Sequence, residues 1–435
     1  MVHGVLALYR RPGLLTTVRH LCYPLRLHGF ASENQTDPAG GTEERVATVI
    51  SKGAGLVALI VVLPGLAAGG SAADAASGVQ TVVVRTGVRV PADTSAVRLN
   101  AVLNGVAATS SQRAWAVGFT DEFGQPPGQL ILQWNGAAWR QWSGLRPADA
   151  SLYGVAATSA TNAWAVGDSD GVLIMRWSAG KWQRSSSPDE GTGSKLLGVA
   201  ASSARSAWAV GCVSCVDGGG HPLALRWNGK SWLNTKLPRT GPGSQMLGVA
   251  ASSARSAWAV GCTRCATTGS KALILRWNGT VWRVVSPPAT GSTAQLSGVA
   301  ASSARAAWAV GCSKCGRSSG RPLILRWNGR AWQRTSVPSG GADGQLSGVA
   351  VRSGRSGWAV GSAGHSSLGV PETLIFRWNG TAWKRVPSPN AGANGGAVVS
   401  VAVTSGISAW AVGYNFNDEP QTLVLRWNGA AWKMS

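Results

Sequence analysis

The sequence predicts an all-β fold, a seven-bladed β-propeller whose blades are four-stranded antiparallel sheets. A pentapeptide, Ala-Trp-Ala-Val-Gly or in one copy Gly-Trp-Ala-Val-Gly, occurs seven times at intervals of about 50 residues. Tryptophan is far commoner than the other aromatic residues, with 22 copies against 4 tyrosines and 5 phenylalanines. A repeat of this length accommodates four short strands and their turns. The tryptophans of the pentapeptide are Trp115, Trp164, Trp208, Trp258, Trp308, Trp358 and Trp410.

Each repeat contains four short apolar runs, which we name A to D. In the fifth repeat they occupy residues 296–301, 306–311, 323–327 and 331–335. Gly, Ser, Pro or Asn residues bound each run, and no run is long enough for a helix, so we expect strands. An Asn-Gly pair between runs C and D tolerates the positive φ of a tight reversal. Run A is rich in glycine and alanine, which suits the crowded axis of the ring.

A single blade exposes an apolar face on either side, so we expect the blades to stack until the ring closes. Three tryptophans per repeat are available to fill the layers between blades, and each buried indole contributes about 4 to 6 kcal/mol before entropic corrections. The last repeat ends shortly after Trp432. Residues 79–89 are typical of a strand, and we hypothesise that they join the last blade as a latch.

The repeat also resembles a known family. Leu-x-Gly-Val-Ala followed by Ala-Trp-Ala-Val-Gly resembles the repeat of photosystem II assembly-factor propellers and their bacterial relatives. The Trp-Asn-Gly turn is similar to a degenerate Asp-box of BNR/sialidase-type propellers, although the Asp and hydroxyl positions of that box are missing. Kelch-type propellers are a more distant comparison because the paired glycines of a kelch strand are absent. The resemblance implies the fold and leaves the chemistry open.

Residues 76–435 carry the propeller, and two segments precede it. The apolar run at residues 54–68 follows Lys52, which predicts a secretory signal peptide over residues 46–75 with cleavage after Ala75. This run of about 15 residues is too short for a membrane span, which needs roughly 20. We therefore expect a secreted or cell-surface protein without a stable span. Residues 1–45 indicate a misassigned start site; a cytoplasmic extension on an uncleaved anchor is the alternative.

The chain is strongly basic, with a formal net charge of +22, and basic surfaces attract anionic partners. Much of the arginine recurs at fixed positions of the repeat, which favours a structural role. In an antiparallel blade the A–B and C–D turns lie at one end, and the B–C and D–A loops at the other. The B–C and D–A loops vary between repeats, and variable loops on a rigid scaffold usually carry recognition. We therefore predict a basic ligand-binding face on blades three to five, with Arg264, Lys271, Lys314, Arg317 and Arg321.

Six of the 7 cysteines form Cys-x-x-Cys pairs that follow run B in repeats three to five. In an exported protein such pairs favour short disulfides that fix the start of each loop. Zinc is an alternative, although a whole blade separates the pairs. A redox role is another, although a hairpin loop offers no helix N-terminus to lower a thiol pKa. The predicted disulfides are Cys212 with Cys215, Cys262 with Cys265, and Cys312 with Cys315.

The repeats contain no recognisable catalytic constellation. His221 and His365 have no partner histidine or carboxylate at the spacing of metal ligands or a catalytic triad. A sialidase-like reaction needs a tyrosine nucleophile, and only Tyr153 and Tyr414 are available, both at the edges of the repeated motifs. The carboxylates lie singly or in pairs in loops, where a solvated role is favoured. We therefore predict no catalytic residue, no metal and no cofactor.

Two classes of function remain. The first is a non-catalytic extracytoplasmic binding or scaffold propeller that recognises an anionic cell-envelope polymer or a protein through its B–C and D–A loops. The alternative is a glycan-acting hydrolase, similar to BNR/sialidase enzymes, with unrecognised active-site residues. DNA binding is not favoured, because aromatic and basic residues do not alternate on an exposed strand. We expect a monomer.

Overall fold

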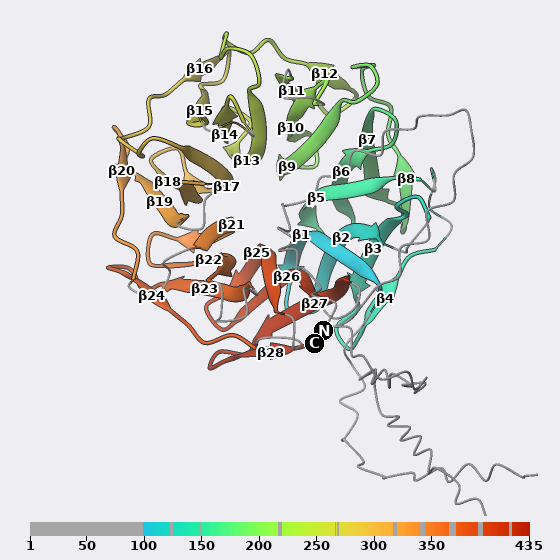
Figure 1. The fold of residues 1–435 in the computed structure, drawn as a ribbon. Coiled ribbons are helices and arrows are strands. Elements are labelled where there is room, and N and C mark those ends of the chain that lie inside the picture. Colours follow the sequence, from blue (N-terminus) through green and yellow to red (C-terminus); the bar gives the residue numbers. More distant parts are fainter. Residues whose placement is uncertain are drawn as a thin grey trace, which may run out of the picture. The chain divides into compact units, whose positions relative to one another are not determined.

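The computed structural model describes residues 99–435, except 122–124, 144, 146, 148, 216–219, 266, 268, 316–319, 339–343, 365–370, 390–394 and 417–419. Within these residues the regular elements are strands, arranged as seven antiparallel sheets of four (Figure 1). The expected start-site segment (1–45), signal peptide (46–75) and latch strand (79–89) lie outside the described residues. The predicted seven-bladed propeller is confirmed.

Each blade consists of four strands that are consecutive in sequence, A to D from the axis outward. The A strands are β1 (Ala101–Ser110), β5 (Ser151–Ser159), β9 (Lys195–Ser203), β13 (Gln245–Ser253), β17 (Ala294–Ser303), β21 (Gly344–Ser353) and β25 (Gly396–Ser405). The B strands are β2 (Arg113–Thr120), β6 (Asn162–Asp168), β10 (Ser206–Val213), β14 (Ser256–Thr263), β18 (Ala306–Ser313), β22 (Ser356–Ala363) and β26 (Ser408–Phe416). The C strands are β3 (Gln129–Trp134), β7 (Val172–Ser178), β11 (His221–Trp227), β15 (Lys271–Trp277), β19 (Arg321–Trp327), β23 (Glu372–Trp378) and β27 (Pro420–Trp427). The D strands are β4 (Trp139–Gln141), β8 (Lys181–Arg184), β12 (Trp232–Asn234), β16 (Trp282–Val284), β20 (Trp332–Arg334), β24 (Trp383–Arg385) and β28 (Trp432–Met434).

The glycine that ends the pentapeptide is required by a β-bulge in strand A. In blade four the register between β13 and β14 shifts between Met246 and Gly248, which leaves Leu247 without a partner. The bulge brings the carbonyl oxygen of Gln245 so close to Gly261 that an added Cβ would overlap it. The same shift occurs in all seven blades. The repeated glycine is therefore selected by close backbone approach.

The tryptophans form the layers between blades, as predicted. Trp258 of blade four is fully buried and contacts Trp327 and Trp332 of blade five, with ring centroids 4.9 and 5.0 Å apart. The guanidinium of Arg276 lies over the Trp258 and Trp327 rings, at 5.2 and 5.3 Å from their centroids. Equivalent stacking involves the arginines of the other Leu-Arg-Trp or Phe-Arg-Trp segments and Arg176. These arginines have the structural role that their repetition indicates.

The layer between blades one and two differs from the others. Trp142, which follows β4, packs against Trp177 at 5.1 Å, and the Trp115–Trp177 distance is correspondingly longer, 6.2 Å. Blade one carries Gln133 where the other blades carry arginine, and its Oε1 accepts a hydrogen bond of 3.0 Å from the Trp142 indole N–H. An extra indole thus takes part in a layer that lacks the stacked arginine.

The ring closes between blades seven and one with the same tryptophan contacts. Trp410 lies 4.9 Å from Trp134 and 5.0 Å from Trp139. The residues just before β1 also pair with β27: Thr422 N–H donates to the Leu99 carbonyl at 3.0 Å, and Leu99 N–H donates to the Thr422 hydroxyl at 3.2 Å. Figure 1 shows β1 beside β25 to β27. Closure therefore uses both side-chain stacking and a short backbone pairing.

Glycines form a tight ring around the axis. An added Cβ on any of them would lie 3.1 to 3.3 Å from the Cα atom of the equivalent residue in the next blade. These glycines are Gly105, Gly154, Gly198, Gly248, Gly298 and Gly348. Blade seven carries Ser400 at this position, and its hydroxyl accepts a hydrogen bond of 3.2 Å from Val106 N–H of blade one. Among these seven positions, only the one in blade seven, where the ring closes, carries a residue other than glycine.

The C–D turns show a different role for asparagine from the one predicted. In blade four Gly279 has a φ of +106°, whereas Asn278 is not among the residues with positive φ. The Asn278 Oδ1 instead accepts hydrogen bonds of 3.0 Å from the backbone N–H groups of Thr280 and Val281. The positive φ expected of the Asn-Gly pair is therefore present at the glycine, whereas the asparagine closes the turn with its side chain.

Candidate functional site

We call the loops at one end of the ring the loop face, and structural statements about it concern only those of its residues that the structure describes. It comprises the B–C loops (121–128, 169–171, 214–220, 264–270, 314–320, 364–371 and 417–419) and the D–A loops (142–150, 185–194, 235–244, 285–293, 335–343 and 386–395). The two kinds of loop contact each other directly. In blade three Cys215 N–H donates to the Gly193 carbonyl at 2.9 Å, and in blade four Cys265 N–H donates to Gly243 at the same distance. In blades three and four the B–C loop thus lies against the D–A loop that enters the same blade.

The three predicted disulfides are present, and each fixes the start of one B–C loop. The Cα atoms are 5.5 Å apart in Cys212–Cys215, 5.4 Å in Cys262–Cys265 and 5.5 Å in Cys312–Cys315. The third residue of each Cys-x-x-Cys segment adopts a positive φ, between 49° and 57°, which turns the chain within four residues. Their sulfur atoms are joined in pairs and do not act as zinc ligands.

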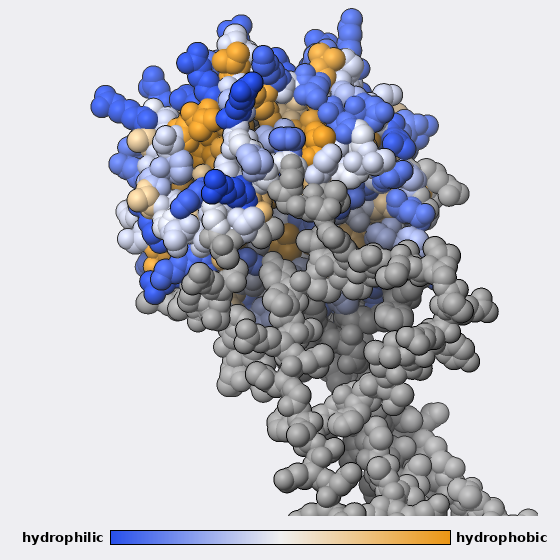
Figure 2. Space-filling model, turned by 45° about the horizontal axis from the view of Figure 1, so that its top comes forward, coloured by the Kyte–Doolittle hydropathy of each residue, from blue (hydrophilic) through white to orange (hydrophobic). Residues whose placement is uncertain are grey.

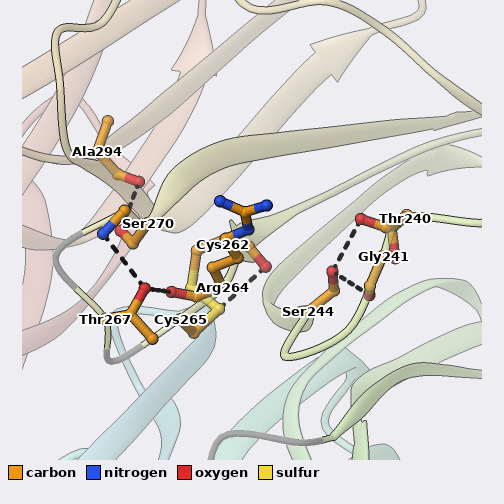
Figure 3. The surroundings of a disulfide bond; sticks show 10 residues. Thr240, Gly241, Ser244, Cys262, Arg264, Cys265, Thr267, Ser270 and Ala294 are labelled. Atoms are coloured by element: carbon orange, nitrogen blue, oxygen red, sulfur yellow. Dashed lines mark hydrogen bonds between the residues drawn. A yellow bond between two sulfur atoms is a disulfide. The ribbon is translucent and has the colours of Figure 1, made fainter.

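Further hydrogen bonds stabilise the loops around the disulfide of blade four (Figure 3). The Thr267 hydroxyl donates to the Arg264 carbonyl at 2.8 Å, and the Ser270 hydroxyl donates to the Ala294 carbonyl at 3.1 Å. In the neighbouring D–A loop the Ser244 hydroxyl lies 2.8 Å from the Gly241 carbonyl. The loops are therefore held by a covalent bond and by local polar contacts.

The basic residues predicted on this face occupy equivalent positions in two neighbouring blades. Arg264 and Lys314 are the third residues of their Cys-x-x-Cys segments, and Lys271 and Arg321 begin β15 and β19. All four are exposed. Lys271 Nζ donates to the Ser292 carbonyl at 2.9 Å, which links its blade to the following D–A loop. Arg317, the fifth predicted residue, lies outside the described residues.

The loop face also carries the acidic side chains, which the sequence reasoning did not assign to one end of the molecule. The carboxylates that the structure describes are Asp121, Asp149, Asp168, Asp170, Asp189, Glu190 and Glu372. All of them lie in B–C or D–A loops or at the strand ends beside these loops. The face is therefore mixed in charge, with its predicted cations on blades four and five.

A cavity of about 360 Å³ lies on the axis, lined by the A strands. The bulged residue of each A strand lines it, and this residue differs between blades: Asn104, Tyr153, Leu197, Leu247, Ser297, Ser347 and Val399. Seven otherwise similar blades thus line the axis with unlike side chains. The variable position in Leu-x-Gly-Val-Ala is the sequence signal that could have found this lining.

Tyr153, Asp168 and Lys195 form a polar cluster where this cavity meets the loop face. Lys195 Nζ lies 3.2 Å from Asp168 Oδ2 and 5.9 Å from the centroid of the Tyr153 ring. Burial, followed by the charge of Asp168 and its hydrogen bond, raises the pKa of the Tyr153 phenol well above its usual range. A nucleophilic tyrosine needs a lowered pKa, so this environment does not favour the sialidase-like role considered for Tyr153.

A second hollow, of about 520 Å³, lies beside the D–A loop that leaves blade three. His221, Lys236 and Arg239 are among its lining residues. Asn234, also in the lining, donates from Nδ2 to both carboxylate oxygens of Glu190, at 2.9 and 3.0 Å.

Among the comparisons with known proteins, only the one with solved structures finds similarities, and these concern the fold. No family model matches the chain, and no curated protein matches it. The structure is similar to that of YCF48 bound to D1 peptide, with 13% identity over 76% of this chain and 95% of that chain and a TM-score of 0.50. It is also similar to U3-55K, with 13% identity, 74% and 95% coverage and a TM-score of 0.50. YCF48 from Cyanidioschyzon merolae gives 15% identity, 74% and 96% coverage and a TM-score of 0.47.

Identities this low show the fold alone. YCF48 is a photosystem II assembly factor, so the similarity supports the propeller resemblance that the repeat motifs predict. Two further observations concern the described residues. They contain no helix long and apolar enough to span a bilayer. They also contain no group of three or more His, Cys, Asp or Glu side chains placed to hold a metal ion.

Proposed function

We propose that the chain is an exported, non-catalytic binding module that recognises a cell-envelope polymer or a protein at its loop face. The observation that carries this proposal is the construction of the B–C loops on blades three to five. Each begins with a disulfide and is hydrogen-bonded to the adjacent D–A loop, yet the residues beyond differ between blades. A loop whose start is fixed loses less entropy on binding, and residues that vary beyond that start leave the chemistry free to be specific.

Export is part of the same proposal. Disulfides persist in oxidising compartments and are rare in the reducing cytosol. The three bonded cysteine pairs therefore support the interpretation of residues 46–75 as a secretory signal peptide. The similarity to YCF48 bound to D1 peptide is compatible with protein binding by such a scaffold, but its low identity supports no particular ligand.

The charges of the loop face suggest where an anionic ligand binds. Arg264, Lys271, Lys314 and Arg321 are exposed on blades four and five. On the blade two to three side, Lys195 is paired with Asp168, and further carboxylates follow in the D–A loop. We assign anionic groups of the ligand to blades four and five, and neutral or cationic groups to the side that carries Asp189 and Glu190.

The test is an array of cell-envelope polymers, glycans and envelope proteins, scored for both binding and cleavage. A loop-face variant combines Arg264→Gln, Lys271→Gln, Lys314→Gln and Arg321→Gln. We expect the parent to retain an anionic ligand with an affinity that falls as salt is added, and the loop-face variant to lose most of that affinity. Equal retention by both proteins would contradict the assignment. Product release from a glycan would replace the proposal with the hydrolase alternative.

A further inference from the structure

The opposite end of the ring carries a second set of basic residues, on what we call the turn face. This face comprises the A–B turns (111–112, 160–161, 204–205, 254–255, 304–305, 354–355 and 406–407) and the C–D turns (135–138, 179–180, 228–231, 278–281, 328–331, 379–382 and 428–431). Figure 2 shows hydrophilic side chains projecting over much of the visible surface of the ring, with smaller apolar areas between them. Four consecutive blades, three to six, have an exposed arginine at the same position of the A–B turn. These residues, the arginine arc, are Arg205, Arg255, Arg305 and Arg355.

The backbone and stem of each arc arginine are held in place. Arg255 N–H donates to the Ser253 hydroxyl at 3.3 Å, and the same contact recurs in the other three blades. The stem lies over the neighbouring C–D turn, since a Cβ added to Gly279 would lie 3.4 Å from the Arg255 Cβ. The indole N–H of Trp277 also donates to the Ala254 carbonyl at 3.3 Å, which ties the two turns together. The guanidinium groups therefore project from an ordered surface.

Packing explains the long side chain at this position but not its charge. Blade one has Gln112 at this position, and its side chain covers Gly136. Blade seven has Ile407, and a Cβ added to Gly429 would lie 3.5 Å from the Ile407 Cβ. A neutral amide and an aliphatic chain thus cover the turn where arginine does in blades three to six. The repeated positive charge needs another reason.

The turn face lacks compensating charge among the described residues. All the described carboxylate side chains lie at the loop face, at the other end of the strands from the turns. The two ion pairs present in this part of the chain, Lys195–Asp168 and Arg385–Glu372, do not involve the arc. Exposed Lys230, Arg330 and Arg352 add further positive charge to the turns or beside them. The result is a surface of one sign, which produces a strong positive potential.

We propose that the turn face binds the anionic headgroup surface of a lipid bilayer. Repetition of the blade places the arc residues at equivalent heights around the axis, so that a planar anionic surface can contact all of them together. Clusters of four to eight basic residues are typical of anionic-lipid binding. Two aliphatic side chains also project at this face: Ile407 is 71% exposed and Val281 is 45% exposed. Such residues enter the interfacial layer beside basic groups. This inference does not depend on the proposed role of the loop face.

The test is co-sedimentation of the purified full chain with phosphatidylcholine vesicles, with and without phosphatidylglycerol. An arc variant carries Arg205→Gln, Arg255→Gln, Arg305→Gln and Arg355→Gln, the residue that blade one has at this position. We expect binding to phosphatidylglycerol vesicles to fall about fivefold per arginine removed, and to fall with salt. The loop-face variant defined above is the matched control, because it removes the same charge from the other end and should bind like the parent.

All variants begin at the same residue as the parent protein, so any binding by the segment before residue 99 is common to them, and matching melting temperatures confirm that each variant is folded. Equal binding by the arc variant and the parent would overturn the proposal, as would equal losses in the arc and loop-face variants. Ile407→Ser should weaken binding to phosphatidylglycerol vesicles and leave retention on a heparin column unchanged. Arc-dependent binding to heparin without vesicle binding would identify a soluble polyanion instead of a bilayer. Loss of binding on the envelope array by the loop-face variant tests the proposed function separately.

Discussion

The arginine sandwiched between tryptophans allows a quantitative test of how the blades are held together. Arg276 lies 5.2 Å from the centroid of buried Trp258 and 5.3 Å from that of Trp327, which is 4% exposed. A cation–π contact contributes about 0.5 to 1 kcal/mol at exposed sites and about 2 kcal/mol when desolvated. Arg276→Met keeps the length and apolar packing of the stem but removes the cation. Because this substitution abolishes two partly desolvated cation–π interactions, we expect the free energy of unfolding to fall by about 1 to 2 kcal/mol.

Urea unfolding followed by tryptophan fluorescence measures this difference, since the substitution removes no indole. Arg276→Lys keeps the charge without the planar guanidinium and should lie between the parent and Arg276→Met. Trp258→Ala is the positive control, because removing a buried indole costs about 3 to 5 kcal/mol. If Arg276→Met matched the parent while Trp258→Ala was strongly destabilised, the cation would contribute nothing and the arginine would act only through its stem.

Three further predictions concern a glycine, a disulfide and a carboxyl group. Gly261→Ala places a methyl group against a strand A carbonyl oxygen, so we expect the free energy of unfolding in urea to fall by about 3 kcal/mol. Gly406→Ala is the control, because a Cβ at Gly406 would meet no atom within 4 Å and should change the free energy little. Similar losses in the two variants would refute the argument that the bulge requires Gly261. Removing the disulfide by Cys262→Ala with Cys265→Ala should lower stability by about 2 kcal/mol, from the entropy of a four-residue loop, and an unchanged urea midpoint would contradict this. Burial raises the pKa of the Glu190 carboxyl, so the folded state binds its proton more tightly than the unfolded state, and ionisation costs stability as pH rises through that pKa. Glu190→Gln should therefore be more stable than the parent at pH 7 and lose that advantage in acid, and an advantage that persisted in acid would exclude this cause.

The repeat architecture was accessible to sequence analysis because one template fixes both spacing and chemistry. Trp258 recurs at the same place in every repeat, and only an inter-blade layer buries so many indoles in equivalent surroundings. The disulfides were equally accessible to sequence analysis, because the two cysteines of a Cys-x-x-Cys segment at the end of strand B are expected to form a disulfide in an oxidising compartment. In both cases a short local pattern determines the contact.

Features that depend on contacts between repeats were not accessible. Trp142 takes part in one layer only, because blade one has Gln133 in place of the stacked arginine. Tyr153 looked peripheral within its motif, yet the ring geometry places it at the axis beside Asp168. Each of these depends on which blade lies next, which a single repeat does not specify.

The distribution of charge between the two faces depends on how the repeats are arranged in the ring, which the sequence of one repeat does not specify. Variation between repeats directs attention to the loop face, where Arg264 and Lys314 follow the disulfides. A turn residue that recurs in consecutive repeats, such as Arg255, is by the same criterion assigned to structure. In a closed ring, however, a side chain repeated in consecutive blades becomes a continuous surface of one charge, and the described carboxylates that would neutralise it are confined to the other end. Recurrence of one residue in consecutive repeats is therefore compatible with binding when the ligand is itself extended and uniform, as a bilayer surface is. Gln112 and Ile407 make the distinction testable, because they preserve the packing of the turn without its charge.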